Sequence, residues 1–401
     1  MSLVAADFSR ARLGILATFA TMGFAIASAA TRLAEIKHHL EVSNSVFGFA
    51  LACTTLGSLI GNMQAHRLVV RFGSKRIVQA FGVLMMCSVA LYGSIWFIWQ
   101  LAVLAFLAAF GYSTMNVAIN AQGVDVEVHL NRSVMPAFHG AWSIGSLATS
   151  LLGGLVAAVI PPQWHLIAVG VFAITAMLFA SQSLLPIDDV PEEIDHRAKV
   201  EGATLRLLLV TAFGLSLGAI AEGCVLDWSN IYLHEYVGIS LGLNTLGLTA
   251  FLVAQISGRL LVGRLNDRFG VPRVVGLAAA AGSCGFLLSI ITVRLGIANG
   301  RFELGGNSTL IVSCLGFVVL GLGVSPLPAA YLSAAGRIDG LTTARGISLL
   351  ALMNACFLLV LRPFISWTTD AFDVSTALMV AGLALAGSSL MARNLRHILS
   401  E

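Results

Sequence analysis

The sequence predicts an all-α membrane protein with twelve transmembrane helices in two pseudo-symmetric six-helix bundles. Its mean hydropathy is +0.89, and charged residues make up 11% of the chain, whereas a soluble domain carries about 25%. Twelve apolar segments approach or exceed the roughly 20 residues that a helix needs to cross a bilayer. A short charged turn also recurs after 197 residues in a chain of 401. Such a repeat is typical of membrane proteins built from two homologous halves.

The expected helices follow the apolar segments along the chain. The first six are expected at 12–33, 44–66, 76–96, 98–122, 134–160 and 164–186. The second six are expected at 206–231, 241–263, 274–293, 308–333, 344–367 and 374–392. The first segment is too long for a signal peptide and lacks a clear cleavage site, so we expect it to be retained. Pro326 and Pro328 are expected to break the tenth helix.

The longest polar interruption separates the sixth and seventh segments. The stretch 187–205 carries eight charged residues and Pro191. We therefore expect an N-terminal six-helix bundle over 1–186, a cytoplasmic linker over 187–205 and a C-terminal six-helix bundle over 206–401.

Lysine and arginine are distributed unevenly between the two sides of the predicted spans. If the N-terminus is cytoplasmic, 18 of the 23 Lys and Arg residues fall on the inner side, Arg259 among them. The outer side receives Arg32, Lys37, Arg294 and Arg301, and Arg362 lies within a span. Because cytoplasmic loops are enriched in these residues, we predict that both termini are cytoplasmic.

The repeated turn carries a recognisable pattern. In the second half it reads Gly263-Arg-Leu-Asn-Asp267-Arg268-Phe269-Gly270-Val-Pro-Arg273. Its first-half counterpart reads His66-Arg67-Leu-Val-Val70-Arg71-Phe72-Gly73-Ser-Lys75-Arg76. The second copy resembles the signature loop of the major facilitator superfamily, G-x-x-x-D-R-x-G-x-x-R/K, between the second and third helices of each half. The resemblance covers essentially the whole chain.

The resemblance implies that these turns belong to a cytoplasmic gate. The implied gating residues are Arg71, Gly73, Arg76, Gly263, Asp267, Arg268, Gly270 and Arg273, with Glu127 as a partner for the loop arginines. In the family the acidic residue is thought to clamp the gate. Val70 replaces that acid in the first half, so the clamp is expected in the C-terminal half.

Further stretches are similar to the fucose-permease-like and rhizopine-transport-like branch of that superfamily. They are Ala29–Lys37, Asn116–Glu127, Phe138–Gly145 and Glu222–Ser229. Asn116 stands where relatives often carry Asp, which argues against a proton site on the fourth helix.

Three of the ionisable residues inside predicted spans require an explanation, because a charge there costs at least a few kcal/mol on insertion scales, about 2.5–3.5 at the centre. They are Glu222 and Asp227 in the seventh span and Arg362 in the eleventh. We expect Arg362 to pair with Glu222 or Asp227. Such a pair would either fix the helix packing or serve as a proton or substrate switch, with Glu222 and Asp227 as the proton-coupling candidates. Asp227 could equally be an interfacial residue.

Other residues inside spans are candidates for binding a polar solute. The candidate substrate-binding residues are Asn116, His139, Trp142, Gln255, Asn354 and Arg362. Asn116 and Asn120 share one helix face, and their amides both donate and accept hydrogen bonds. Trp142 offers a stacking face, and His139 can change protonation near neutral pH. Each of these residues could instead serve helix packing or hydrogen bonding between helices.

Together these features predict a secondary active transporter of the bacterial inner membrane. It would move a small polar solute, namely a sugar, polyol or amino sugar, by alternating access, and proton coupling through Glu222 is compatible with this interpretation. An exporter of drug-like or metabolic compounds and a non-transporting solute receptor are the alternatives.

Other classes of function lack their motifs. The sequence has no Walker loop and no nucleophile or zinc-protease motif, so we do not expect an enzyme. Six cysteines stand singly in apolar segments, which favours neither disulfides nor a metal site. We expect no cofactor, no metal and no nucleic-acid partner. The expected partners are the solute, the lipid bilayer and protons, and we expect a monomer.

Overall fold

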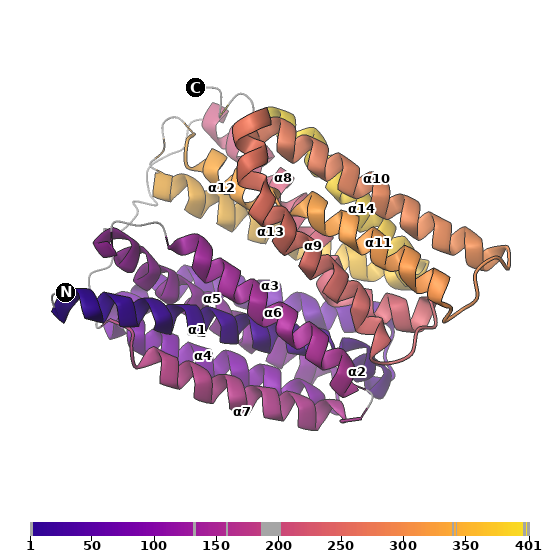
Figure 1. Cartoon of the computed structure of the whole chain (residues 1–401), viewed down its shortest axis with the longest axis horizontal. Coiled ribbons are helices and arrows are strands. Elements are labelled where there is room, and N and C mark those ends of the chain that lie inside the picture. The colour runs from indigo at the N-terminus through magenta and orange to yellow at the C-terminus, as the bar shows by residue number, and fades with distance from the viewer. Residues whose placement is uncertain are drawn as a thin grey trace. The chain divides into compact units, whose positions relative to one another are not determined.

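The computed structural model describes residues 3–130, 134–157, 159–185, 202–338, 341, 343–395 and 398. Over these ranges the chain is helical, without strands, and divides into two compact units, Met1–Glu192 and Glu193–Glu401 (Figure 1). We call them unit 1 and unit 2. Most of the linker expected at 187–205 lies outside the described residues, and the seventh span begins at Gly202 rather than 206.

Unit 1 contains seven helices and a short turn. They are α1 (Leu3–Ala30), α2 (Leu33–Leu40), α3 (Asn44–Phe72), α4 (Ser74–Leu91), η1 (Tyr92–Ser94), α5 (Ile98–Leu130), α6 (Met135–Ala157) and α7 (Pro162–Ser181). Neighbouring helices in space follow the order α3, α5, α4, α7, α1, α6. Helix α2 is short and follows α1 directly.

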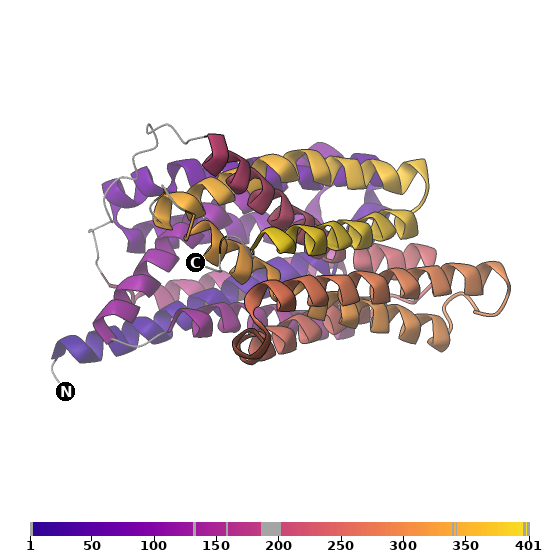
Figure 2. The ribbon, with the colours of Figure 1, turned by 90° about the horizontal axis from the view of Figure 1, so that it is seen from above.

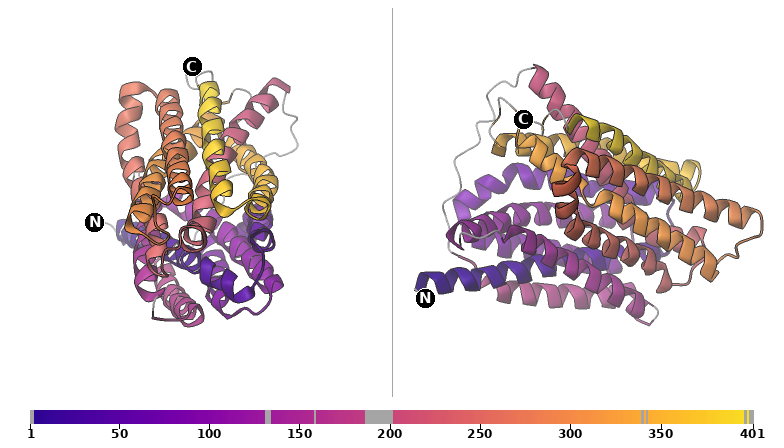
Figure 3. Two further views of the ribbon diagram at one scale, coloured as in Figure 1. Left: turned by 90° about the vertical axis from the view of Figure 1, so that its right-hand side faces the viewer. Right: turned by 45° about the horizontal axis from the view of Figure 1, so that its top comes forward.

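Unit 2 repeats this arrangement. Its elements are α8 (Gly202–Ile231), η2 (Tyr232–Tyr236), η3 (Leu243–Thr245), α9 (Leu246–Phe269), α10 (Val271–Ala298), α11 (Asn307–Val324), α12 (Leu327–Ala335), α13 (Thr343–Ala371), α14 (Val374–Met391) and η4 (Ala392–Asn394). The spatial order is α9, α11, α10, α14, α8, α13, which matches unit 1 helix for helix. Figure 2 and Figure 3 show the α10–α11 hairpin of this unit as two adjacent antiparallel helices. The described residues contain twelve candidate membrane spans, so the prediction of two pseudo-symmetric bundles is confirmed.

The first span of each unit is the most buried one. In both α1 and α8, 67% of the apolar window is buried, whereas the sixth span reaches 44%. In unit 1, Phe19 of α1 stacks on Phe138 of α6 with ring centroids 5.9 Å apart, and Met22 and Met115 lie in the same core. Several polar residues of these helices, such as Thr18 on α1 and Ser216 on α8, are therefore fully buried.

Close packing of α1 against α6 depends on glycine. A Cβ added to Gly23 would overlap the carbonyl oxygen of Trp142, and one added to Gly145 would overlap that of Ala20. Lipid provides no hydrophobic force between helices, so small residues that let backbones approach supply the association.

Helices α3 and α9 each run six residues past the end of the predicted span, although the candidate span on α3 itself ends at Ala65. Helices α3 and α9 continue past 66 and 263 to Phe72 and Phe269, because polar residues extend a helix into water as readily as apolar ones extend it in lipid. Each helix ends at a glycine with positive φ, 79° at Gly73 and 82° at Gly270. The break expected in the tenth span is confirmed, since α11 ends at Val324 and α12 begins at Leu327.

Candidate functional site

In unit 2, one face of α8 carries polar residues toward α13. Ser216, Gly223 and Asp227 are separated by seven and four residues, which places them on one side of a helix with 3.6 residues per turn. The Ser216 hydroxyl donates to Oδ1 of Asn354 on α13 at 2.8 Å. Asn354 is therefore already engaged by α8 through its carbonyl oxygen, and its NH₂ group provides two further donors.

Arg362 of α13 lies against the same face of α8. Its Nη2 atom is 3.3 Å from the place that a Cβ on Gly223 would take, so the glycine leaves room for the guanidinium. Asp227 lies four residues beyond Gly223 on the same face of α8. The pairing of Arg362 with Glu222 or Asp227 stays a prediction.

Glu222 points away from this face, toward α9. Its Oε1 atom lies 3.9 Å from Nη2 of Arg259, and the side chains are 22% and 35% exposed. Both residues belong to candidate spans. Arg259 lies within the predicted span 241–263, about 15 Å before α9 ends at Phe269 at about 1.5 Å per residue, and its place on the inner side stays a prediction.

One turn before Arg259 on α9 lies Gln255, whose side chain is buried. Its Nε2 group has no hydrogen-bond partner among the described residues. A buried donor without a partner costs about 1–3 kcal/mol. Gln255 and Arg259 are four residues apart and share a helix face, so an unpaired amide donor lies next to the Glu222–Arg259 pair.

The candidate residues of unit 1 lie on α5 and α6. On α5, Nδ2 of Asn120 donates to the backbone oxygen of Asn116 at 2.7 Å and to its Oδ1 at 3.0 Å. The exposed His139 of α6 contacts the Phe19 ring edge to face at 5.3 Å. The Nε1 atom of Trp142 is buried and has no partner within the described ranges. On α5, the amide of Asn120 therefore hydrogen-bonds Asn116 of the same helix rather than a residue of another helix.

The two signature-like turns adopt the same backbone geometry. The N–H groups of Gly73 and Gly270 each donate to the carbonyl four residues earlier at 2.8 Å. The guanidinium of Arg71 lies 5.2 Å from the Phe72 ring centroid, and Arg268 lies 5.3 Å from that of Phe269. Among the other predicted gating residues, Arg76, Asp267 and Arg273 have exposed side chains, and Gly263 lies on the exposed surface of α9. The side chain of Glu127 lies outside the described residues.

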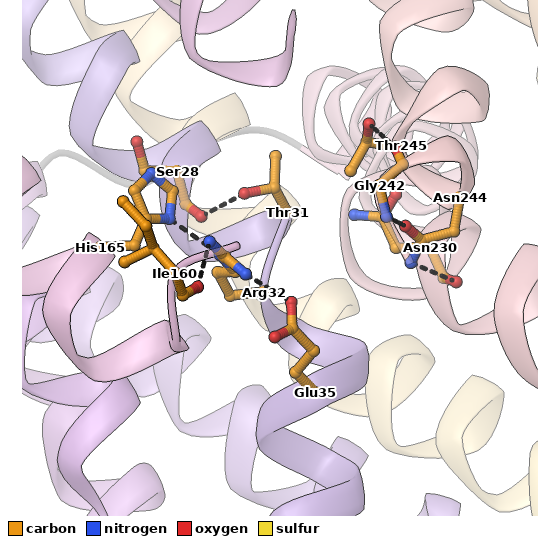
Figure 4. A network of polar contacts seen from close by, with 10 residues as sticks. All are labelled: Ser28, Thr31, Arg32, Glu35, Ile160, His165, Asn230, Gly242, Asn244 and Thr245. Atoms are coloured by element: carbon orange, nitrogen blue, oxygen red, sulfur yellow. Dashed lines mark hydrogen bonds and ion pairs between the residues drawn. The ribbon is translucent and has the colours of Figure 1, made fainter. Parts of the chain in front are cut away.

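Unit 1 also contains an arginine whose surroundings were not expected. Arg32, in the turn between α1 and α2, is fully buried. Nη1 donates to Glu35 Oε1 at 2.7 Å, Nε to His165 Nδ1 at 2.8 Å and Nη2 to the Ile160 oxygen at 3.1 Å (Figure 4). The sequence does contain an indication that Arg32 is enclosed, because apolar residues follow it as well as precede it. Apolar residues also flank Arg259 on both sides.

A second cluster joins α10 to α14. Arg294 Nη2 lies 3.1 Å from Asp373 Oδ2, and Asp373 Oδ1 accepts from the Ser375 hydroxyl and the Thr376 N–H as the N-cap of α14. Burial alone would raise the pKa of Asp373, but these hydrogen bonds and the Arg294 charge together lower it below its ordinary value. The cluster fixes one end of unit 2.

Comparison with known proteins places the chain in a family. The family model of the Major Facilitator Superfamily matches residues 13–338. The chain belongs to the Major Facilitator Superfamily. The signature turns of α3–α4 and α9–α10, the two bundles and the repeat are therefore features of a membrane transporter of this superfamily.

Relatives within the superfamily cover nearly the whole chain. An uncharacterized transporter of Sinorhizobium fredii is 29% identical over 96% of this chain and 98% of its own length. Membrane protein MosC of Rhizobium meliloti is 24% identical over 89% of this chain and 83% of its own. The chain thus has the extent of these Major Facilitator Superfamily relatives.

Solved structures with the same fold include two transporters. The nucleoside transporter NupG superimposes with a TM-score of 0.72 at 12% identity, covering 98% of this chain and 99% of NupG. A D-xylose-proton symporter gives 0.72 at 15% identity, covering 96% of both chains. At these identities the likeness shows the Major Facilitator Superfamily fold and leaves the cargo open.

Proposed function

We propose that the chain is a proton-coupled secondary transporter of a small polar solute, namely a sugar, polyol or amino sugar, that works by alternating access. The observation that carries the proposal is the Glu222–Arg259 pair within two spans of unit 2. Family membership supports transport in general. The pair adds a titratable group at membrane depth, where ionisable residues mark ion and substrate pathways.

The geometry of the pair suits reversible protonation. A separation of 3.9 Å with both side chains partly exposed is a loose contact, whereas a tight ion pair has N–O distances of about 2.7–2.9 Å. A proton on Glu222 cancels the attraction to Arg259. A ligand shifts a conformational equilibrium only through a difference in its affinity for the two states. A proton that competes with Arg259 for Glu222 has such a difference, so it can drive a change in the position of α9 relative to α8.

The same region offers donors to a hydroxylated solute. The Nε2 group of Gln255 lacks a partner in the described part of the chain, and a solute hydroxyl would satisfy it. We keep the full set of proposed substrate-binding residues, which is Asn116, His139, Trp142, Gln255, Asn354 and Arg362. In this scheme Asp227 holds Arg362 in place or takes up a proton itself.

The signature turns are proposed to form the cytoplasmic gate. Their exposed arginines and the glycine caps of α3 and α9 make two equivalent charged corners. The proposed gating residues are Arg71, Gly73, Arg76, Glu127, Gly263, Asp267, Arg268, Gly270 and Arg273. Both termini are proposed to be cytoplasmic, which places these corners on the inner side of the bacterial inner membrane.

The test is proton movement driven by solute in proteoliposomes. Sugars, polyols and amino sugars are screened beside amphipathic drugs, with a pH dye inside the vesicles and labelled solute outside. The variant Glu222→Gln keeps the shape of the side chain and removes its charge. Glu303→Gln, at an exposed position between α10 and α11, is the matched control.

We expect one polar solute to drive proton movement in the wild type and in Glu303→Gln. In Glu222→Gln the proton signal should disappear while labelled solute still exchanges. Solute crossing without protons in the wild type would replace the proposal with uniport or another ion. Amphipathic cargo alone would indicate an exporter, and binding without crossing would indicate a receptor.

A further inference from the structure

The buried Arg32 joins two turns at the end of unit 1 that the charge distribution predicts to face outward. Its guanidinium bonds Glu35 of α2, the Ile160 carbonyl of the α6–α7 turn and the His165 ring in the first turn of α7. Figure 4 shows the guanidinium between these partners. The α1–α2 turn is thereby held to the α6–α7 turn.

The bond to His165 defines the protonation state of the ring. The Nε atom of arginine is always a donor, so Nδ1 of His165 must accept and the ring must be neutral with its proton on Nε2. A second proton would remove the Nδ1 lone pair and set two cations 2.8 Å apart. The positive end of the α7 helix dipole adds to this repulsion.

Other charged groups near His165 are few in the described region. Helices α1, α4 and the turn η1 pack against α7. Helix α4 carries Lys75 and Arg76 at the opposite end, where Lys75 Nζ bonds the Gln182 oxygen, and η1 contributes the buried Tyr92. Helix α1 carries Arg10 and Arg12 toward its N-terminal end, away from the end that Arg32 follows. In the described region the charges nearest the imidazole are therefore those of Arg32 and of Glu35, which bonds Arg32.

Unit 2 contains a histidine whose ring nitrogen donates rather than accepts, directly after α8, the helix that corresponds to α1. Nδ1 of His234, between α8 and α9, lies 2.9 Å from the carbonyl oxygen of Ile239. A carbonyl only accepts, so this ring nitrogen carries a hydrogen in the neutral and the charged form alike. Protonation preserves the His234 bond and destroys the His165 bond.

We propose that His165 is a proton-responsive latch at the outer end of unit 1. In its neutral form it holds Arg32 and keeps the α1–α2 and α6–α7 turns together. Protonation expels the guanidinium from the ring and separates the two turns. The latch is independent of the proposed coupling role of Glu222, because it lies in the other unit and shares no residue with the Glu222–Arg259 pair.

The test is hydrogen–deuterium exchange of the full-length protein in lipid nanodiscs at pH 7.5 and pH 5. Labelling times are scaled for the pH dependence of intrinsic exchange. In the wild type, peptides covering 27–40 and 159–172 should exchange faster in acid, by up to about tenfold per pH unit below the ordinary histidine pKa of about 6.5. Peptides covering 231–246, around His234, should show no such acceleration.

The variant His165→Asn keeps an acceptor for Arg32 but does not titrate between pH 5 and pH 8, so its exchange at 27–40 should be independent of pH. His39→Asn, at an exposed histidine of α2, should behave as the wild type. The proposal is overturned if the wild-type peptides do not respond to acid, or if they respond equally in His165→Asn. The wild-type comparison of the two units decides the question even if the variant does not fold.

Discussion

Substitution by leucine is expected to have opposite effects on stability at two buried glutamines. Gln255 of α9 and Gln122 of α5 are both almost completely buried, at 1% and 0% exposure. Gln255 leaves its Nε2 group unpaired in the described structure. Gln122 donates to Ser74 Oγ and to the Leu185 oxygen, each at 2.7 Å, and accepts from the Leu185 N–H at 3.0 Å. Replacing either one by leucine removes an amide and leaves a side chain of similar size.

The magnitudes follow from counting hydrogen bonds. Gln122→Leu loses three bonds of about 1 kcal/mol each and leaves groups of Ser74 and Leu185 without partners, so unfolding should become easier by about 3 kcal/mol or more. Gln255→Leu loses no bond of Nε2 and removes a desolvation cost of about 1–3 kcal/mol. We therefore expect Gln255→Leu to raise the thermal stability of the protein and Gln122→Leu to lower it.

The two variants are also expected to differ in solute transport. If Gln255 binds the solute, the stabilised Gln255→Leu should show a KM raised by about tenfold, which corresponds to about 1.4 kcal/mol of lost binding. Thermal unfolding in detergent and solute uptake into proteoliposomes measure the two effects. Loss of stability in both variants would refute the assignment of Gln255 as an unpaired amide. Gain of stability with unchanged KM would remove Gln255 from the binding site.

Three further substitutions test other parts of the structure. Gly223→Ala puts a methyl group 3.3 Å from Arg362 Nη2, so the guanidinium must shift by a few tenths of an ångström, and solute flux should fall while the thermal unfolding temperature changes little. The pKa of Asp373 is lowered in the folded protein. The stability that the ionised Asp373 contributes is therefore complete above its unfolded pKa of about 3.9, and it is lost as the pH falls through the lower folded pKa. Acid titration below about pH 4 should consequently lower the unfolding temperature of the wild type more than that of Asp373→Asn. Gly270→Ala forces alanine to φ 82° and should cost about 1–2 kcal/mol, whereas Gly263→Ala, where an added Cβ meets nothing within 4 Å, should not destabilise; unfolding temperatures of the two variants give the comparison.

Hydropathy and the internal repeat were sufficient to predict the architecture, because lipid leaves helices as the simplest way to pair every backbone polar group. The repeated Arg-Phe-Gly located both turns, and the structure shows that its glycines, Gly73 and Gly270, cap α3 and α9. The exact ends of α3 and α9 could not be predicted from hydropathy, since the apolar pattern stops at the membrane surface while the helix continues to Gly73 and Gly270.

The charge partners inside the membrane were harder to predict. Sequence distance along a span gives depth but not the direction in which a side chain points, so depth alone suggested Glu222 or Asp227 as the partner of Arg362. The structure places Arg362 against Gly223 on one face of α8 and turns Glu222 toward Arg259 on another. The partner of Glu222 is Arg259, which was counted with the inner-side charges although it lies within the predicted span 241–263.

The two proposals give the Arg259 and Arg32 clusters different reasons to respond to acid, and this difference makes their roles separable. Arg259 faces a carboxylate, so protonation of Glu222 removes an attraction. Arg32 faces an imidazole, so protonation of His165 adds a repulsion. Glu222→Gln should abolish solute-driven proton movement yet leave the acid-dependent exchange of residues 27–40 intact, and His165→Asn should do the reverse. If either substitution abolished both responses, the two units would have to share one proton site, which the separate positions of these residues in unit 1 and unit 2 argue against.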